Sequence, residues 1–224
     1  MLARIPDLLS DAQLQAMRQQ LRSAQWIDGR ATAGYQGAGV KRNLQLDERS
    51  ALARELGGVL MSELERNPLF ISAALPNRVY PPLFNCYENG MTFGTHVDNA
   101  VRLMPDGSKL RTDLSITVFL ANPDEYDGGE LIIEHTFGTQ EIKLPAGDAI
   151  LYPASSLHRV APITRGARLA SFFWIESLVS GDAERAILFD MDSSIQRLRA
   201  TSADEAACLQ LTNCYHNLLR IWTR

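Results

Sequence analysis

The chain has 224 residues, of which 46% are hydrophobic and 21% charged, and its formal net charge at pH 7 is −4. This length allows one catalytic unit with a buried core and a small appended unit. The composition is that of a globular protein and excludes a fibrous or disordered chain. The 22 basic residues are scattered and are outnumbered by 26 acidic ones, which argues against a nucleic-acid partner.

The sequence also gives no sign of a membrane partner or of a secretory leader. No apolar run approaches the ~18 residues of a membrane span, and Pro6 and Asp7 interrupt the short apolar stretch at the start. Cys86, Cys208 and Cys214 are odd in number and lack the close spacing of a metal site. We therefore expect a soluble protein of the cytoplasm.

The first 65 residues are predicted to be mainly helical. Ser10 to Gln13 has the pattern of a capping box and begins a helix that runs to Trp26, because apolar residues then recur at helical spacing. A second helix is predicted for Ser50–Glu65, and Val40–Leu46 is predicted to be a strand. The Gly-rich stretch Gly29–Gly39 is either a surface loop or a substrate lid.

From Leu75 to Glu176 the sequence changes to short β-branched and aromatic runs separated by turn signals, which is typical of an all-β sandwich or barrel. After Glu176, apolar residues return to helical spacing and predict a helix pair. We expect an α+β protein with a catalytic unit at residues 1–176, whose core is about 75–176, and a helical unit at 177–224. The apolar stripes of the helical ends predict that they cover the barrel and contribute to a homodimer surface.

Three residues are candidate metal ligands. In His96-Val97-Asp98 a strand would point His96 and Asp98 the same way, with Val97 and Phe93 pointing into packing. Iron(II) in oxygenases takes imidazole and carboxylate ligands on one face of its octahedron, and His158 is the candidate third ligand. The His-x-acid pattern alone is weak, because 4 His and 26 acidic residues give about half a chance match in such a chain.

An arginine ten residues beyond His158 adds an anion site to this pattern. The turn at Pro162–Gly166 would fold the strand of Arg168 back against that of His158, so that both side chains share one cavity. A guanidinium suits a carboxylate because its planar fork makes bidentate hydrogen bonds. Arg159 and Arg165 lie nearby and are the competing candidates for this role.

In its ordered motifs the sequence resembles the PKHD-type (prolyl/lysyl hydroxylase-like) 2-oxoglutarate oxygenases, and within them the bacterial iron-uptake-associated, PiuC-like branch. The resemblance covers nearly the whole chain. It rests on Tyr87-x-x-Gly90-x-x-Phe93-x-x-His96-x-Asp98, Asp127-Gly128-Gly129-Glu130-Leu131, Gly147-Asp148, His158 and Arg168.

The resemblance implies a double-stranded β-helix (jelly roll) that binds iron(II) through His96, Asp98 and His158. It implies that Arg168 holds the distal carboxylate of 2-oxoglutarate, and that ascorbate serves as a reductant. Tyr87 is either a core aromatic residue or a second contact to this co-substrate. Two positions depart from many relatives, because Ala170 replaces a serine and Phe119 replaces a tyrosine, which removes two hydroxyl groups near the expected co-substrate.

We therefore expect a dioxygenase that uses iron(II), 2-oxoglutarate and O₂ to hydroxylate a substrate, with release of succinate and CO₂. The substrate is not identified by sequence: a peptidyl proline or lysine, a siderophore and another small molecule all remain open. Lys41 and Asn43 are weak candidates for contacting it. The alternatives are a non-catalytic jelly roll that senses iron or 2-oxoglutarate, and a cupin-like metalloenzyme that needs no 2-oxoglutarate.

Overall fold

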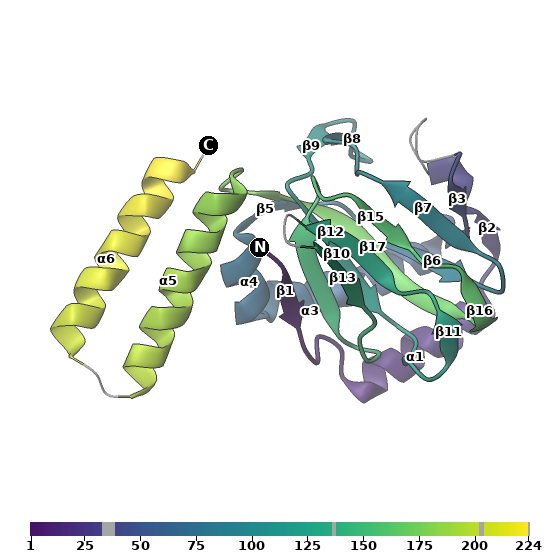
Figure 1. Cartoon of the computed structure of the whole chain (residues 1–224), viewed down its shortest axis with the longest axis horizontal. Helices are drawn as coiled ribbons and strands as arrows, with labels where there is room; N and C mark the ends of the chain where they lie inside the picture. The colour runs from purple at the N-terminus through teal and green to yellow at the C-terminus, as the bar shows by residue number, and fades with distance from the viewer. Residues whose placement is uncertain (33–38, 136–137, 202–203, 224) are drawn as a thin grey trace.

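A computed structural model describes residues 1–32, 39–135, 138–201 and 204–223 of the chain. Within these ranges, most strands form two antiparallel sheets, and the last two helices lie side by side at one end of the molecule (Figure 1). The predicted α+β class is confirmed, with a jelly-roll core, helices before it and a helix pair after it. None of the described helices is both long and apolar enough to cross a membrane.

The larger sheet has eight strands among the described residues, in the order β1-β14-β10-β17-β6-β4-β2, with β5 also paired to β17. They are β1 (Ala3–Ile5), β2 (Trp26–Asp28), β4 (Leu44–Leu46), β5 (Pro76–Val79), β6 (Leu83–Tyr87), β10 (Leu114–Phe119), β14 (Ala149–Pro153) and β17 (Arg168–Ser177). The long strand β17 lies between β10 and β6. Residues from three distant parts of the sequence are therefore brought side by side at the middle of this sheet.

The smaller sheet has the order β13-β12-β15-β7-β3. Its strands are β3 (Lys41–Arg42), β7 (Thr92–His96), β12 (Leu131–His135), β13 (Gly138–Ile142) and β15 (His158–Val160). Two further pairs join β8 (Val101–Leu103) to β9 (Lys109–Arg111) and β11 (Tyr126–Gly128) to β16 (Ile163–Gly166). The strand pairs described here are all antiparallel, as the short runs and tight turns predict.

The two faces of the larger sheet have different surroundings. On β10, Leu114, Ile116 and Val118 belong to the main hydrophobic core together with leucines of the preceding helices. The alternate residues Ser115 and Thr117 line a cavity on the opposite face. The period of two along a strand thus separates the packing face from the face that carries the site.

The N-terminal helices bury their apolar sides in this core. Helix α1 (Asp11–Arg22) begins with the predicted capping box, in which the Ser10 side chain accepts from the Gln13 backbone and the Ser10 N–H donates to Gln13 Oε1 at 3.0 Å. Helix α3 (Ala51–Arg66) agrees with the prediction within one residue at each end. The short helix α4 (Pro68–Ala74) was not predicted, although Asn67 as N-cap and Pro68 in the first turn are its start signal.

The predicted strand Val40–Leu46 is instead two short strands that belong to different sheets. β3 pairs with β7 of the smaller sheet, whereas β4 pairs with β6 of the larger one. The chain changes sheets at Asn43, and the period of two cannot continue through such a crossing. Before it, a 3-10 turn occupies Gly29–Thr32. The two interpretations of the Gly29–Gly39 stretch concern mainly residues 33–38, which lie outside the described residues.

Helices α5 (Asp182–Ala200) and α6 (Glu205–Trp222) form the predicted pair at the end of the chain. Tyr215, Leu218 and Trp222 of α6 pack against a cluster that contains Leu188 of α5. The buried Arg185 of α5 donates through Nη1 to the carbonyl oxygens of residues 179 and 180, at 2.6 and 2.8 Å. These contacts attach the start of the pair to the end of β17.

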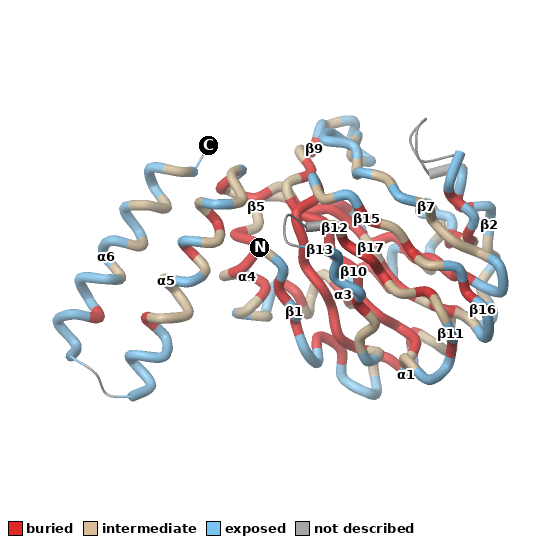
Figure 2. The backbone as a smooth tube through the Cα atoms, viewed as in Figure 1, coloured by how far each residue is buried: buried red, intermediate tan, exposed pale blue. Residues whose placement is uncertain are grey.

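Packing within the chain accounts for only part of the apolar stripes from which the homodimer was predicted, since Ile187, Leu198 and Leu211 remain 47%, 37% and 38% exposed. Figure 2 shows that most of α6 outside this contact is exposed, and Leu209 and Ile221 retain 68% and 69% of their accessible surface. These two residues are separated by about 120° around the helix, so they do not form one stripe. The homodimer remains a prediction. Sedimentation at micromolar concentration tests it, because a species of 24.9 kDa would contradict it.

Candidate metal centre

A cavity of about 310 Å³ lies between the two sheets and contains the predicted site residues. Its walls come from β3, β7 and β15 on one side and from β6, β10, β14 and β17 on the other. The volume is near the lower end for small-molecule sites. The polar and charged residues that line it include Lys41, Tyr87, His96, Asp98, Arg102, Ser115, His158 and Arg168.

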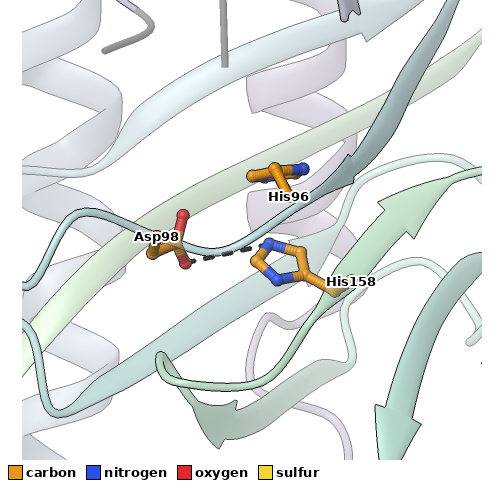
Figure 3. Close-up of side chains that lie close together, drawn as sticks. All are labelled: His96, Asp98 and His158. Atoms are coloured by element: carbon orange, nitrogen blue, oxygen red, sulfur yellow. Dashed lines mark ion pairs between the residues drawn. The ribbon is translucent and has the colours of Figure 1, made fainter. Parts of the chain in front are cut away.

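The three predicted metal ligands converge in this cavity (Figure 3). His96 is the last residue of β7 and His158 the first of β15, and the two are direct partners across the antiparallel pair. Asp98 follows β7 by two residues, and its Oδ2 lies 3.8 Å from Nε2 of His158. One ligand atom from each residue lies within 4.8 Å of the others, which is the spacing of atoms that share one metal ion.

The hydrogen bonds of the two histidines fix which nitrogen faces the cavity. Nδ1 of His96 donates to the carbonyl oxygen of Gly94 at 2.8 Å, and Nδ1 of His158 donates to that of Ser156 at 3.0 Å. A carbonyl can only accept, so both protons are on Nδ1 and each Nε2 keeps its lone pair for a metal. Ser115 donates its hydroxyl to Oδ2 of Asp98 at 2.6 Å, which holds the carboxylate in place.

The local electrostatics favour the neutral form of His96. Burial, together with the nearby His158, lowers the pKa of His96 to about 4. An imidazole that is neutral at pH 7 is the form that coordinates a metal. The donor set is therefore two imidazoles and one carboxylate, which is the ligand set of the facial iron(II) triad.

Two details of β7 differ from the prediction. Val97 is 45% exposed rather than packed, and the Phe93 ring stacks on His96 with centroids 3.6 Å apart instead of pointing away from it. A β-bulge accounts for the position of Phe93, because His96 is three positions after Phe93 whereas their partners His158 and Val160 are only two positions apart. The extra residue changes the alternation and places Phe93 on the metal side.

Of the three candidate arginines, Arg168 is the one that lines the cavity. It is the first residue of β17, opposite Tyr87 of β6, and is 1% exposed. Its guanidinium lies between the rings of Tyr87 and Phe119, at 5.5 and 5.3 Å from their centroids. The competing Arg165 is exposed, and its Nε lies 2.6 Å from Oδ2 of Asp127. Arg159 is not among the described residues that line the cavity, and its Nη1 lies 3.9 Å from Oε1 of Glu134.

The buried Nε of Arg168 has no hydrogen-bond partner among the described residues, and the Tyr126 hydroxyl lies beside the same guanidinium. Burial raises the pKa of Tyr87 to about 12, so its phenol keeps its proton and can donate. Buried donors without acceptors are costly, at about 1–3 kcal/mol each. This end of the cavity is therefore suited to an anion such as a carboxylate.

Gly129 makes room for the arginine. Its φ is +70°, and a Cβ at this position would lie 2.4 Å from Ile163 Cδ1 and 3.1 Å from Arg168 Cδ. This contact gives a physical reason for the second glycine of the Asp127-Gly128-Gly129 motif. The first, Gly128, faces the Pro162 carbonyl in the same way, at 2.0 Å from its Cβ position.

We expect Gly129→Ala to destabilise the fold and to weaken binding at Arg168. The left-handed backbone alone costs an alanine about 1–2 kcal/mol, and the methyl group would displace the arginine. Gly107→Ala is the matched control, because Gly107 has φ +82° and nothing within 4 Å of its Cβ position. Urea unfolding should show a loss in both variants, whereas anion binding should fall only in Gly129→Ala. Equal binding in the two variants would contradict this role.

Of the two weak candidates for substrate contact, only Lys41 lines the cavity. It is 3% exposed, donates to Gln45 Oε1 at 2.8 Å, and lies over the rings of Phe93 and Phe172. Burial, together with the positive charge of Arg102, lowers the pKa of Lys41 to about 8. Asn43 is buried beside Gly29 and is not among the described lining residues.

Three residues of the site were not identified from the sequence. Ser115 was detectable as an inward position on a strand whose alternate residues are apolar. Arg102 and Trp174 carried no such signal, because their contact joins a short hairpin to β17 across 72 positions of sequence.

Comparisons with known proteins agree with this geometry. Residues 82–176 match the family model of the 2OG-Fe(II) oxygenase superfamily, and residues 182–223 match that of the PKHD-type hydroxylase C-terminal domain. The jelly roll and the His-Asp-His cluster thus fall in the class of iron(II)- and 2-oxoglutarate-dependent oxygenases. A PKHD-type hydroxylase of Burkholderia ambifaria is 65% identical, over 100% of this chain and 99% of its own. One of Saccharophagus degradans is 55% identical over 100% of both chains. The chain belongs to the PKHD-type hydroxylases.

Solved structures resemble the fold at much lower identity. A prolyl-4-hydroxylase of Pseudomonas putida has a TM-score of 0.54 at 17% identity, covering 79% of this chain and 92% of its own. A viral collagen prolyl hydroxylase from Paramecium Bursaria Chlorella virus-1, solved as a 2OG complex, has a TM-score of 0.51 at 16% identity, covering 79% and 96%. At this identity they support the jelly-roll fold alone.

Proposed function

We propose that this enzyme holds iron(II) through Nε2 of His96, Nε2 of His158 and a carboxylate oxygen of Asp98. The observation that carries the proposal is the pair of Nδ1–H bonds to backbone carbonyls, which leaves both Nε2 lone pairs directed into a cavity beside a carboxylate. Three protein ligands leave positions for a co-substrate and O₂. Asp98 completes the set as the hard, anionic ligand.

We further propose Arg168 and Tyr87 as the residues that bind 2-oxoglutarate. The buried Arg168 would pair with the distal carboxylate, and the protonated phenol of Tyr87 would donate a hydrogen bond. Ala170 and Phe119 are direct cross-strand partners. The serine and tyrosine hydroxyl groups that relatives have at these two positions are therefore both missing from the same part of the sheet. The buried hydroxyl of Tyr126, which lies beside Arg168, is the group that would supply a donor there instead.

When bound, iron(II) and 2-oxoglutarate supply the activation of O₂, with succinate and CO₂ as products and a hydroxylated substrate. The protein's own part is to orient the imidazoles by their hydrogen bonds to the carbonyl oxygens of Gly94 and Ser156, and the carboxylate by the hydrogen bond that the Ser115 hydroxyl donates to it. The aromatic residues Phe93, Phe172 and Trp174 keep the cavity apolar around the reacting groups. Ascorbate is proposed as the reductant that restores oxidised iron.

A turnover experiment tests the proposal against its two alternatives. The protein is loaded anaerobically with iron(II) and 2-oxoglutarate, which should give a visible metal-to-ligand charge-transfer band, and is then exposed to O₂ with candidate substrates. We expect mass spectrometry to detect succinate and a product heavier by one oxygen atom. A sensor would bind both ligands without consuming 2-oxoglutarate, and a cupin-like enzyme would consume O₂ without forming succinate.

The candidate substrates are a proline- or lysine-containing peptide, a siderophore and other small molecules. Resemblance to the iron-uptake-associated branch places the siderophore among them, and a link to iron uptake is proposed on that ground alone. Cys86, Cys208 and Cys214 are free thiols, which supports a cytoplasmic location. We propose residues 1–176 as the catalytic unit and 177–224 as the helical unit attached to it.

A further inference from the structure

A second arginine lies in the same cavity as the metal centre. Arg102 is on β8, four residues after Asp98, and its Cζ stacks 3.8 Å from the ring centroid of Trp174 and 5.0 Å from that of Tyr80. Its buried Nε has no hydrogen-bond partner among the described residues. The Tyr80 hydroxyl interacts with another part of the guanidinium, so the edge that carries Nε is the one left to bind an acceptor.

Arg102 is separate from the residue proposed to anchor the co-substrate. Arg168 and Trp174 are on the same strand, β17, six residues apart, which at 3.3 Å per residue is about 20 Å along the strand. Trp174 is the cross-strand partner of Ser115, which holds Asp98. The metal ligands therefore lie beside the Arg102 end of the cavity, and Arg168 lies toward the other.

A charge count shows that Arg102 remains uncompensated. With the proposed ligands bound, the charges of iron(II) and Arg168 are balanced by Asp98 and the two carboxylates of 2-oxoglutarate. Asp98 is the single acidic residue among the described lining residues, whereas Lys41 and Arg102 are both cationic. Positive charge in a partly closed, aromatic cavity attracts an anion, because few waters are available to screen it.

We propose that the substrate carries an anionic oxygen group, a carboxylate or a phosphate, that binds the edge of Arg102, with Lys41 as a second positive charge. This inference rests on the proposed function, because it takes Arg168 to be occupied by 2-oxoglutarate. Trp174 acts as a platform that positions the guanidinium. The substrate class is therefore an acidic small molecule or an acidic group on a larger one, rather than a neutral or cationic one.

The test measures binding of matched charged and neutral probes to the iron(II) and 2-oxoglutarate complex without O₂. The probes are phenylacetate, its neutral counterpart phenylacetamide, and phenyl phosphate, followed by intrinsic tryptophan fluorescence. The charge-transfer band is recorded in each sample to verify that 2-oxoglutarate stays on the metal. The variants are Arg102→Gln, Arg102→Lys and, as a matched control, Lys109→Gln, because Lys109 is exposed on the same hairpin.

We expect at least one of the two anions to bind at least tenfold more tightly than phenylacetamide. Arg102→Gln should reduce this preference to below threefold, Arg102→Lys should retain part of it, and Lys109→Gln should leave it unchanged. The relative affinity of phenylacetate and phenyl phosphate distinguishes a carboxylate from a phosphate site.

Other outcomes would overturn the inference. A preference below threefold in the unmodified protein, or one that persists in Arg102→Gln, would mean that Arg102 only anchors its hairpin. Loss of the band on adding an anion would show displacement of 2-oxoglutarate from Arg168 instead of binding at Arg102. In these cases the proposed function stands. If the charge-transfer band is missing before any probe is added, both the proposed function and this inference are contradicted.

Discussion

His158→Ala is expected to abolish iron(II) binding at micromolar metal, and His96→Ala and Asp98→Ala should do the same. Each change removes one of three ligands from an open site in which no other described His, Cys, Asp or Glu forms such a cluster. Ser115→Ala should have a smaller effect, because it removes only the hydrogen bond that orients Asp98. Outer partners of this kind are worth about 10–100-fold in metal affinity, so a direct ligand should cost more.

The measurement is anaerobic titration with iron(II) and quantification of retained metal. His216→Ala is the matched control, because His216 is exposed on α6, outside the cavity, and should leave the affinity unchanged. Asp98→Glu should also impair binding, since the added methylene group moves the oxygen from its place beside His158. A triad variant that keeps both the metal affinity and the turnover of the unmodified chain would show that its residue is not a ligand.

The sequence was sufficient to predict the strand-rich centre, the flanking helices and the clustered triad. These features depend on periodicity, turn signals and the spacing of a few polar residues, which are local in the chain. The pairing of His96 with His158 needed a single register between β7 and β15. The sequence predicted His158 as the third ligand but did not predict this pairing.

The features that were missed depend on contacts between distant segments. The bulge in β7 reverses the side of Phe93, and nothing in its own sequence marks the extra residue. The change of sheet at Asn43 depends on which strands are free to pair, which only the completed fold decides. The stacking of Arg102 on Trp174 likewise requires that β8 lies over β17. A pattern of period two predicts which side chains share a face of one strand. It does not predict bulges, changes of sheet or contacts between distant strands.

Arg168→Ala is expected to raise the concentration of 2-oxoglutarate needed for half-saturation by about 30-fold or more, with iron affinity almost intact. Arg168 is 1% exposed and carries its charge into the cavity. Removing one member of a buried charge pair typically costs about 2–5 kcal/mol, much of it because the other charge is left unpaired. A cost of about 2 kcal/mol corresponds to roughly 30-fold in affinity. The triad is untouched, so metal binding serves as an internal control.

The charge and the shape of Arg168 can be separated by Arg168→Lys, which should recover only part of the affinity, because an ammonium group cannot reproduce the bidentate fork. Arg165→Ala is the control for loss of a nearby positive charge, since Arg165 is exposed and paired with Asp127. The readout is 2-oxoglutarate titration of the iron(II)-loaded protein without O₂, following the charge-transfer band. Near-normal affinity in Arg168→Ala, with loss in Arg159→Ala or Arg165→Ala instead, would move the carboxylate anchor to that neighbour. Such a result would also leave the buried Nε of Arg168 without the acceptor that its position between Tyr87 and Phe119 predicts.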